Sequence, residues 1–516
     1  MTDPMKKNMK RYFLISLTAL GIALSAWAQG SDTDYPARVE LTKAQSAWFN
    51  SANAAGMAID PLARYSDLSF GYNLGRGDFR LQPEGNTNIL NIATSGATSL
   101  GRGYVWGSFD YKNHSATDTR FNTMTLNLED DLPFIVSDAN ISPWKKQRYD
   151  MSLKAATPLV SDLVSFGISA NYFTESGAKQ VDPRCHDYEY GITVEPAVAF
   201  HFGGHSVGLS GIYRNGNIRE VPVNSNSQQN QVAYILRGLG NFTDAVVGSL
   251  GSLGTFYYNR NLYGGSLQYG FGGRDLKMLF EGGYTWQMVD VFQTPTKPRR
   301  MGSTVQQKIS GKAQIIAADD DFFHKVTVEG FHRTTDGIEF LQELSTVEWE
   351  TLTKYVRSNY TLDHLSLGYD FFRKNDYGYS WMAGVRGAYD ERNDKYILPA
   401  SEMTYKNLTG ELYAKKNWMI GEVSVLGSLR GAFRKNLGGT YRYGGAEPSS
   451  VIVKEFYQKD FEYNTADCWK AGAALSVAFP IGGRTAMFCQ LDGDYLKPLN
   501  RDSKRLLATL TLGFTF

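Results

Sequence analysis

After its first 28 residues, the sequence lacks any apolar run long enough to form a transmembrane helix. No later stretch reaches the roughly 18 consecutive apolar residues that such a helix needs. Proline is scarce, with 16 residues, and the 53 Lys and Arg residues balance the 52 Asp and Glu residues. A near-neutral chain offers no strongly basic surface, so we expect no nucleic-acid partner.

Cysteine is equally scarce, with three residues in the whole chain. A hairpin centred near Gly482 would place Cys489 opposite a residue near position 475, out of disulfide reach of Cys468. Cys185 falls in a predicted loop and has no evident partner. We therefore expect no structural disulfide.

Histidine and metal-ligand patterns are also missing. The seven histidines are scattered, and Cys185-His186 has no further ligands at a useful spacing. The glycine-rich segments follow no strand–loop–helix pattern that could cradle a phosphate. The sequence therefore predicts neither a metal site nor a cofactor.

The first 28 residues have the features of a signal peptide. Basic residues up to Arg11 precede an apolar run over 12–25, and Ala26-Trp27-Ala28 is an A-x-A cleavage site. We expect cleavage after Ala28 and export from the cytoplasm. Glycine (52), tyrosine (31) and phenylalanine (29) are abundant in the chain, a composition that suits an outer-membrane barrel of a Gram-negative bacterium.

Alternation with a period of two residues is the dominant pattern. Segment 422–434 places Val425 and Leu429 on one face and Ser428 and Arg430 on the other. Many such segments reach the roughly 9–11 residues that a tilted strand needs to cross a bilayer. They lie at 101–112, 146–156, 162–173, 188–200, 206–214, 260–271, 275–288, 306–316, 324–333, 362–373, 379–392, 404–415, 422–434, 469–479, 485–495 and 506–516.

The connections between these segments alternate in length. The short connections are 201–204, 270–274, 319–321, 374–378 and 480–483. The long connections are roughly 113–145, 173–187, 215–259, 289–305, 334–361 and 435–467. Short periplasmic turns and long extracellular loops are typical of outer-membrane barrels, which leave no sheet edge open to lipid.

We therefore predict an all-β fold over 65–516, a transmembrane antiparallel up-and-down β-barrel in the outer membrane. The count is about 16 strands from residue 101 onward. Segment 65–98 also alternates, and the count is 18 if it joins the wall; 14 is the third possibility. Residues 29–64 contain a small-residue stretch, Ala44 to Ala58, which predicts either a periplasmic leader or a plug in the lumen.

The last segment carries an assembly motif. The apolar face of this segment ends on an aromatic residue. The segment resembles the C-terminal signal that the barrel-assembly machinery recognises in outer-membrane proteins. The residues of this predicted signal are Leu510, Leu512, Phe514 and Phe516.

The inward faces carry acids and bases in equal measure. Such charges need partners or water. The sequence leaves two alternatives, cross-strand ion pairs that fill the barrel or a hydrated pathway with weak ion selectivity. The lumen-lining candidates are Arg148, Glu195, Lys277, Glu281, Lys312, Glu329, Asp370, Arg386, Glu411, Arg430, Arg434, Lys470, Asp492 and Asp494.

Catalysis is not expected. Asp492 and Asp494 are similar to the carboxylate pair of outer-membrane aspartyl-type proteases, but those sites also need an Asp–His pair across the lumen. The pattern places His364 inward, close to Asp370 and near mid-strand. The His-x-Ser pattern of outer-membrane phospholipases is missing.

Three stretches identify a family resemblance: AWFNSANAAGMA, DLPFIVSDA (131–139) and VDPRC (181–185). With the terminal signal, they resemble an uncharacterised family of large outer-membrane β-barrel proteins of Bacteroidota type. The resemblance implies partners such as surface lipoproteins or TonB-dependent transporters. A weaker likeness to long-chain fatty-acid transporters lacks the NPA-type signature, where this chain has Asn50-Ser51-Ala52.

Four functions remain open on the sequence. The first is a channel or transport component for a small solute, or an accessory of a surface uptake complex. The second is a closed structural or binding barrel. The third is a transporter of hydrophobic compounds with a lateral opening, for which Pro196 is the one irregularity in the predicted wall. The fourth is an outer-membrane hydrolase.

Overall fold

The computed structural model describes residues 33–78, 80, 82, 85–125, 131–294 and 297–516. The predicted signal peptide lies outside these residues. The strands are β1 (Tyr65–Arg76), β2 (Asn86–Leu100), β3 (Gly103–Thr119), β4 (Val136–Ser137), β5 (Ser142–Ala156), β6 (Val164–Lys179), β7 (His186–Phe202), β8 (His205–Glu220), β9 (Gln231–Gly238), β10 (Asn241–Val247), β11 (Thr255–Gly272), β12 (Leu276–Thr294), β13 (Arg299–Ala318), β14 (Phe322–Leu344), β15 (Trp349–Asn375), β16 (Gly378–Tyr396), β17 (Ser401–Ile420), β18 (Val423–Arg442), β19 (Cys468–Gly482), β20 (Thr485–Pro498) and β21 (Arg505–Thr515).

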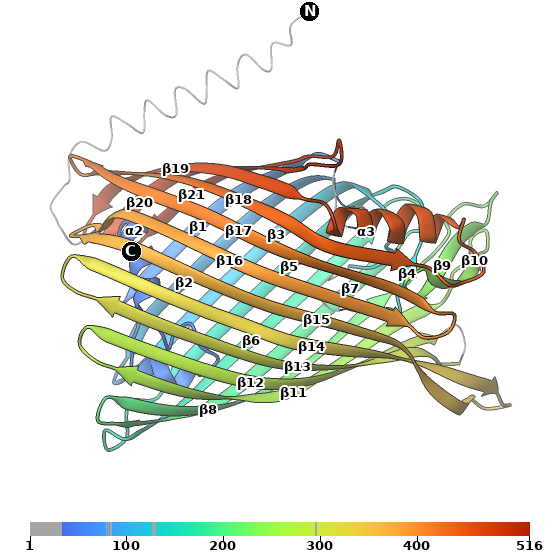
Figure 1. The fold of residues 1–516 in the computed structure, drawn as a ribbon, viewed down its shortest axis with the longest axis horizontal. Coiled ribbons are helices and arrows are strands. Elements are labelled where there is room, and N and C mark those ends of the chain that lie inside the picture. Colours follow the sequence, from blue (N-terminus) through green and yellow to red (C-terminus); the bar gives the residue numbers. More distant parts are fainter. Residues whose placement is uncertain (1–32, 79, 81, 83–84, 126–130, 295–296) are drawn as a thin grey trace, which may run out of the picture.

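The wall is a closed, 18-stranded antiparallel sheet (Figure 1). Neighbouring strands pair in chain order, except that β3 pairs with β5 and β8 pairs with β11, across two connections that hold short strands of their own. The last strand, β21, pairs with β1 along almost its full length, which leaves no open edge. The predicted barrel is confirmed with the larger strand number, because segment 65–98 supplies β1 and β2.

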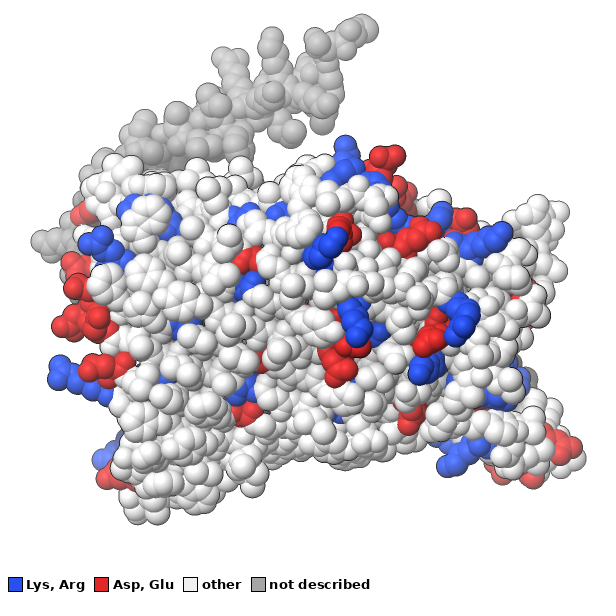
Figure 2. All heavy atoms as spheres, viewed as in Figure 1, with Lys and Arg blue, Asp and Glu red and all other residues white. Residues whose placement is uncertain are grey.

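The outer face of the wall is apolar. Side chains such as Leu267, Ile309, Leu412 and Leu429 are more than half exposed, and each alternates with residues that point into the barrel. Figure 2 shows that most of the face in view carries neither Lys and Arg nor Asp and Glu. An exposed apolar surface of this extent is a lipid-facing band.

The two ends of the barrel differ. Short turns, such as 203–204 between β7 and β8 and 421–422 between β17 and β18, lie at one end, and longer connections lie at the other. We call these the short-turn end and the long-loop end. Two segments predicted as long loops, 289–305 and 334–361, instead continue the strands of β12–β13 and β14–β15. Strand β15 has 27 residues, far more than a bilayer requires, and its hairpin with β14 projects from the long-loop end (Figure 1).

The remaining elements lie at the two ends of the barrel. Helix α2 (Pro36–Gln45) and the 3-10 helix η1 (Ala54–Ala58) belong to the N-terminal segment, residues 33–64, which contacts inward side chains near the short-turn end. At the long-loop end, β4, β9 and β10 form a three-stranded sheet, next to the π-helix η3 (Ile452–Tyr457) and helix α3 (Gln458–Asn464).

Candidate functional site

The predicted lumen-lining residues all lie on the inward face of their strands, opposite the exposed apolar side chains. They fall into groups with different partners. Some contact the N-terminal segment, some form ion pairs with one another, and Arg434 donates to the backbone carbonyls of Tyr463 and Ala466, at the end of α3. In the part of the chain that the structure describes, Glu329, Arg386 and Glu411 form no ion pair.

Charged side chains of the wall bind the backbone of the N-terminal segment. Lys154 Nζ donates to the carbonyl oxygens of Phe49 and Ser51, at 2.8 and 3.2 Å. Lys312 Nζ donates to the carbonyl of Asn50 at 3.1 Å. On β12, Glu281 accepts the backbone N–H of residue 52 at 3.1 Å. These contacts satisfy backbone groups that the irregular stretch between α2 and η1 cannot pair within itself.

An ion pair and a buried amide strengthen this attachment. Lys277 Nζ lies 2.6 Å from Asp60 Oδ1. Asn53 is fully buried, and its side-chain amide donates to the carbonyl of Val198 at 3.0 Å and to Gln268 Oε1 at 2.9 Å. The segment is therefore tied to β7, β11 and β12.

Close packing sets the position of the tryptophan in this segment. Trp48 is 4% exposed and lies against Gly56, where an added Cβ would come within 1.9 Å of the indole. On the wall, a Cβ at Gly167 would meet the backbone N of residue 55 at 2.2 Å. Glycine is required at both positions because ring and backbone approach so closely.

Helix α2 contacts a neighbouring part of the wall, from β14 to β17. Its Leu41 belongs to an apolar cluster with Phe323 and Phe372 of the wall. Glu40 accepts a hydrogen bond from Tyr379 at 2.6 Å and pairs with Lys415. Proline at the first position of this helix costs no hydrogen bond, because that N–H would be unpaired in any case.

The middle of the lumen is polar and accessible to solvent. Arg430 pairs with Asp492 and Asp494, at 2.6 and 2.7 Å, and Lys470 lies 3.2 Å from Asp494. The side chains of Arg148 and its partner Asp150 are each about a third exposed. Charges inside a barrel that retain this exposure face water rather than packed protein. We call this region the central chamber.

The hydrolase alternative finds no support in this geometry. Both carboxylates of the pair, Asp492 and Asp494, are occupied by Arg430. His364 Nδ1 lies 2.7 Å from Asp390 on β16, rather than beside Asp370, which accepts a hydrogen bond from Tyr413. A general base needs to lie within hydrogen-bond reach of the group that it activates.

A second closure, which we call the cap, covers the long-loop end. It consists of residues 120–125, 131–141, 221–254 and 452–464. Strand β4 pairs with β9, and the ring of Phe121 stacks on Phe456 of η3 at 5.1 Å. These residues join buried wall side chains such as Ile218 and Val289 in one apolar core. Burial of this core holds the cap on the wall.

An ionic cluster also fixes the cap to β14 and β16. Asp131, from the DLPFIVSDA stretch, accepts from Arg333 on β14 at 2.6 Å and from Arg392 on β16 at 2.8 Å. Arg392 also pairs with Asp394 at 2.6 Å. The side chain of Asp131 is 3% exposed, so removal of one partner would leave a buried charge without compensation. A cavity of about 120 Å³ adjoins this cluster and the tyrosines of the cap.

Two buried acids at the ends of wall strands, in contact with the cap, are functional candidates that the sequence pattern did not indicate. Glu220, at the end of β8, accepts hydrogen bonds from Thr123 and Tyr258, and burial raises its pKa to about 7. Asp187 binds the thiol of Cys185 and the backbone N–H of residue 125, and burial raises its pKa well above the usual range. The VDPRC stretch adjoins these residues, but alternation alone cannot show that a strand end is covered by a loop.

The wall shows no lateral gap at the predicted irregularity. Pairing between β7 and β8 is interrupted at Glu195 and Pro196, and it resumes in the same register at Ala197. The proline ring lies outside, against Gly211. The missing ladder bonds are those that a proline cannot make.

No group of His, Cys, Asp and Glu in the described residues could hold a metal ion. No helix in that part of the chain is long and apolar enough to cross a membrane.

A closed even-numbered barrel with a lipid-facing band and a charged lumen defines an outer-membrane β-barrel protein. The chain belongs to DUF6850, a family of unknown function whose sequence model matches residues 54–516. The expected membership in an uncharacterised barrel family is confirmed, and the Bacteroidota-type origin stays a prediction.

Comparison with known proteins adds little to this assignment. No curated protein sequence matches the chain. The outer membrane transporter YddB from Escherichia coli is similar at 8% identity and a TM-score of 0.39, over 87% of this chain and 80% of that one. A FadL homologue from Pseudomonas aeruginosa is similar at 11% identity and a TM-score of 0.33, over 90% and 92%. At such TM-scores the likenesses support no conclusion about this chain.

Proposed function

We propose that the protein is a gated outer-membrane channel that passes a small polar solute through the central chamber. The observation that carries this proposal is the set of partly exposed ion pairs on the inward face of the wall, between two closures built from residues outside the wall strands. The N-terminal segment closes the short-turn end and acts as a plug. The cap closes the long-loop end. In this reading, passage requires each closure to move.

The contacts of the plug suit a movable element. Wall lysines hold it through backbone carbonyls and through an ion pair at Asp60, contacts that water can replace. Each such hydrogen bond contributes only about 0.5–1.5 kcal/mol net. The wall ladder is continuous without the plug, so displacement of the plug leaves the barrel closed on itself. The balanced charge of the chamber predicts weak ion preference.

Single-channel conductance in planar bilayers tests this proposal. The full mature chain is expected to be silent or to open rarely. Deletion of 29–62 removes the plug, and Asp131→Asn weakens the cap. We expect brief openings from each variant alone and stable ohmic steps from the two combined. A combined variant that shows the heat-modifiable gel shift of a folded barrel and still stays silent contradicts the channel.

A second candidate is a closed barrel that binds a partner protein at the cell surface. The β14–β15 hairpin favours it, since Leu344, Val347 and Leu352 are exposed near a tip that lies beyond the lipid-facing band. Such apolar side chains outside the bilayer have no lipid to cover them. The predicted surface lipoprotein or TonB-dependent transporter fits here.

Photo-crosslinking in intact cells tests the second candidate. A photoreactive residue at Val347 should give one defined product on the outer face, and the same residue at the lipid-facing Leu412 should not. Equal labelling at both positions contradicts a docking hairpin. The barrel-assembly machinery remains a predicted partner of the terminal strand alone.

A further inference from the structure

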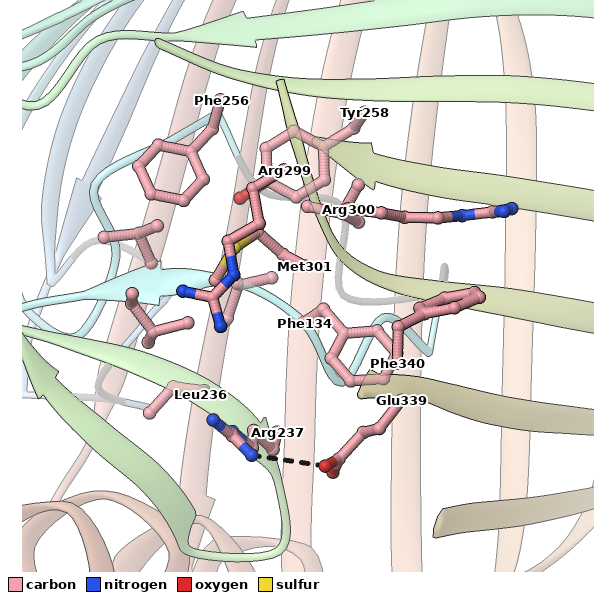
Figure 3. Close-up of a pocket in the computed structure, with 14 residues that line it drawn as sticks. Phe134, Leu236, Arg237, Phe256, Tyr258, Arg299, Arg300, Met301, Glu339 and Phe340 are labelled. Atoms are coloured by element: carbon pink, nitrogen blue, oxygen red, sulfur yellow. Dashed lines mark hydrogen bonds and ion pairs between the residues drawn. The ribbon is translucent and has the colours of Figure 1, made fainter. Parts of the chain in front are cut away.

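A small pocket lies at the seam between the cap and the wall, outside the central chamber. Its floor is made by Phe134 of the cap and by Phe256 and Met301 of the wall, and its volume is about 40 Å³. Figure 3 shows these side chains around a space that Arg237 and Arg299 also line. One water needs roughly 10–15 Å³ of such volume, so the enclosed space admits only a carboxylate-sized group of about three heavy atoms, and the body of a larger ligand lies toward the open side of the pocket.

The charge of this pocket is not balanced. Arg237 pairs with Glu339 at 3.2 Å, and that carboxylate also accepts a hydrogen bond from Tyr396. Arg300 pairs with Asp290. In the described part of the chain Arg299 has no carboxylate partner. The guanidinium of Arg299, an exposed residue, is therefore the one in this pocket without a carboxylate.

The position of Arg299 directs this surplus charge into the pocket. Its guanidinium lies 4.8 Å from the ring centre of Trp349, which fixes one face of the group. Figure 3 shows it pointing from the wall toward Leu236 and Arg237 of the cap. A stacked guanidinium keeps its N–H edge free, and that edge matches the two oxygens of a carboxylate.

The apolar lining defines the rest of the ligand. The guanidinium of Arg300 already lies over one face of Phe340, 4.4 Å from the centre of the ring. Phe134 and Met301 present carbon beside the guanidinium of Arg299. A fully hydrated inorganic anion gains nothing from such walls, whereas an organic anion buries its carbon body there.

We propose that this seam pocket binds a small organic carboxylate, with its carboxylate on Arg299 and its apolar body against Phe134 and Met301. The ligand contacts the cap and the wall together. Binding requires no passage through the barrel, so this site stands apart from the proposed channel.

Equilibrium binding to the detergent-solubilised full chain tests the site, with benzoate as the probe and ligand-observed NMR as the readout. Benzamide, which has the same shape without the charge, is the neutral comparison, and acetate lacks the apolar body. We expect benzoate to bind more tightly than either. Arg299→Gln should weaken benzoate about tenfold or more and leave benzamide unchanged, since a charged hydrogen-bonded pair contributes about 1.5–3 kcal/mol.

The matched control is Arg357→Gln. Arg357 also lies over an aromatic ring, that of Tyr355 at 5.0 Å, and does not line the pocket. It should leave benzoate binding unchanged. Arg299→Lys keeps the charge without the planar edge and should bind with intermediate affinity. Equal affinity for benzoate and benzamide, an unaffected Arg299→Gln variant, or no binding to a folded barrel would each overturn the proposal.

Discussion

The position of the plug depends on close contacts in which a glycine has no room for a side chain. A methyl group at Gly56 would overlap the indole of Trp48, which has no room to move between the segment and the wall. We expect Gly56→Ala to loosen the plug and leave the wall intact, because overpacking of this kind costs about 1–3 kcal/mol. Hydrogen exchange of residues 47–58 should accelerate relative to the wall strands. Gly282→Ala is the control, since nothing lies within 4 Å of its added Cβ, and the same acceleration there would refute the packing argument.

The ionic cluster of the cap gives a pH dependence with a defined sign. Asp394 lies three residues past Glu391, whose exterior pair with Lys406 marks a level outside the lipid-facing band. Burial raises the pKa of Asp394 to about 6, from an ordinary value of about 4, although Arg392 opposes the shift. The closed cap therefore binds this proton more tightly than an opened one. The stability that protonated Asp394 adds to the closed cap is complete below about pH 4 and is lost as the pH rises through 6.

Hydrogen exchange of residues 131–141 measures this effect, after correction for the intrinsic rate. We expect the cap to open more readily at pH 7.5 than at pH 5. Asp394→Asn should reduce this pH dependence, and part should remain because burial also raises the pKa of Glu220. A dependence of opposite sign, or one that Asp394→Asn leaves unchanged, would show that this carboxyl does not control the cap.

At the scale of elements, the β14–β15 hairpin extends beyond what a membrane requires. Replacement of 343–350 by Asn-Gly removes a tip whose Val347 is 77% exposed. Such side chains bury little on folding, so we expect the midpoint of heat modifiability to change by only a few degrees. Leu367→Arg, in the lipid-facing band, is the contrasting variant and should destabilise by about 2–4 kcal/mol. A large loss on truncation would mean that the tip supports the wall.

The wall could be predicted well from the sequence, because successive residues of a wall strand point alternately to lipid and to the lumen. Lipid forces alternation at positions such as Leu429 and Arg430, and the inward charges could be assigned from it. Outside the bilayer this constraint ends. The continuation of β14 and β15 was therefore predicted as a loop.

The closures could not be predicted in the same way. Strand β4 is two residues long and pairs with β9 almost a hundred residues later. Two residues are too few to show an alternation pattern in the sequence. Asp131 lies in a stretch singled out by resemblance, but its partners Arg333 and Arg392 are on distant strands. The choice between a leader and a plug for residues 29–64 also depends on tertiary contacts, such as those of Asn53.

At the scale of the whole molecule, the plug and the wall differ in how readily each opens without the other. The wall is a continuous ladder in which every strand has two neighbours, whereas the plug joins it through side chains. Local opening follows the weakest set of contacts. We expect amides of the plug to exchange before those of β11–β16, at a rate that rises between 0.05 and 1 M salt.

The salt dependence follows from the charges that hold the plug. Lys43 pairs with Asp67, and Lys277 with Asp60, and both lysines are more than a third exposed, where added ions screen an ion pair effectively. Exchange of the plug that precedes the wall and responds to salt is the behaviour of a movable gate. Exchange of plug and wall in one cooperative step, unaffected by salt, is the behaviour of a packed barrel and would favour the binding function over the channel.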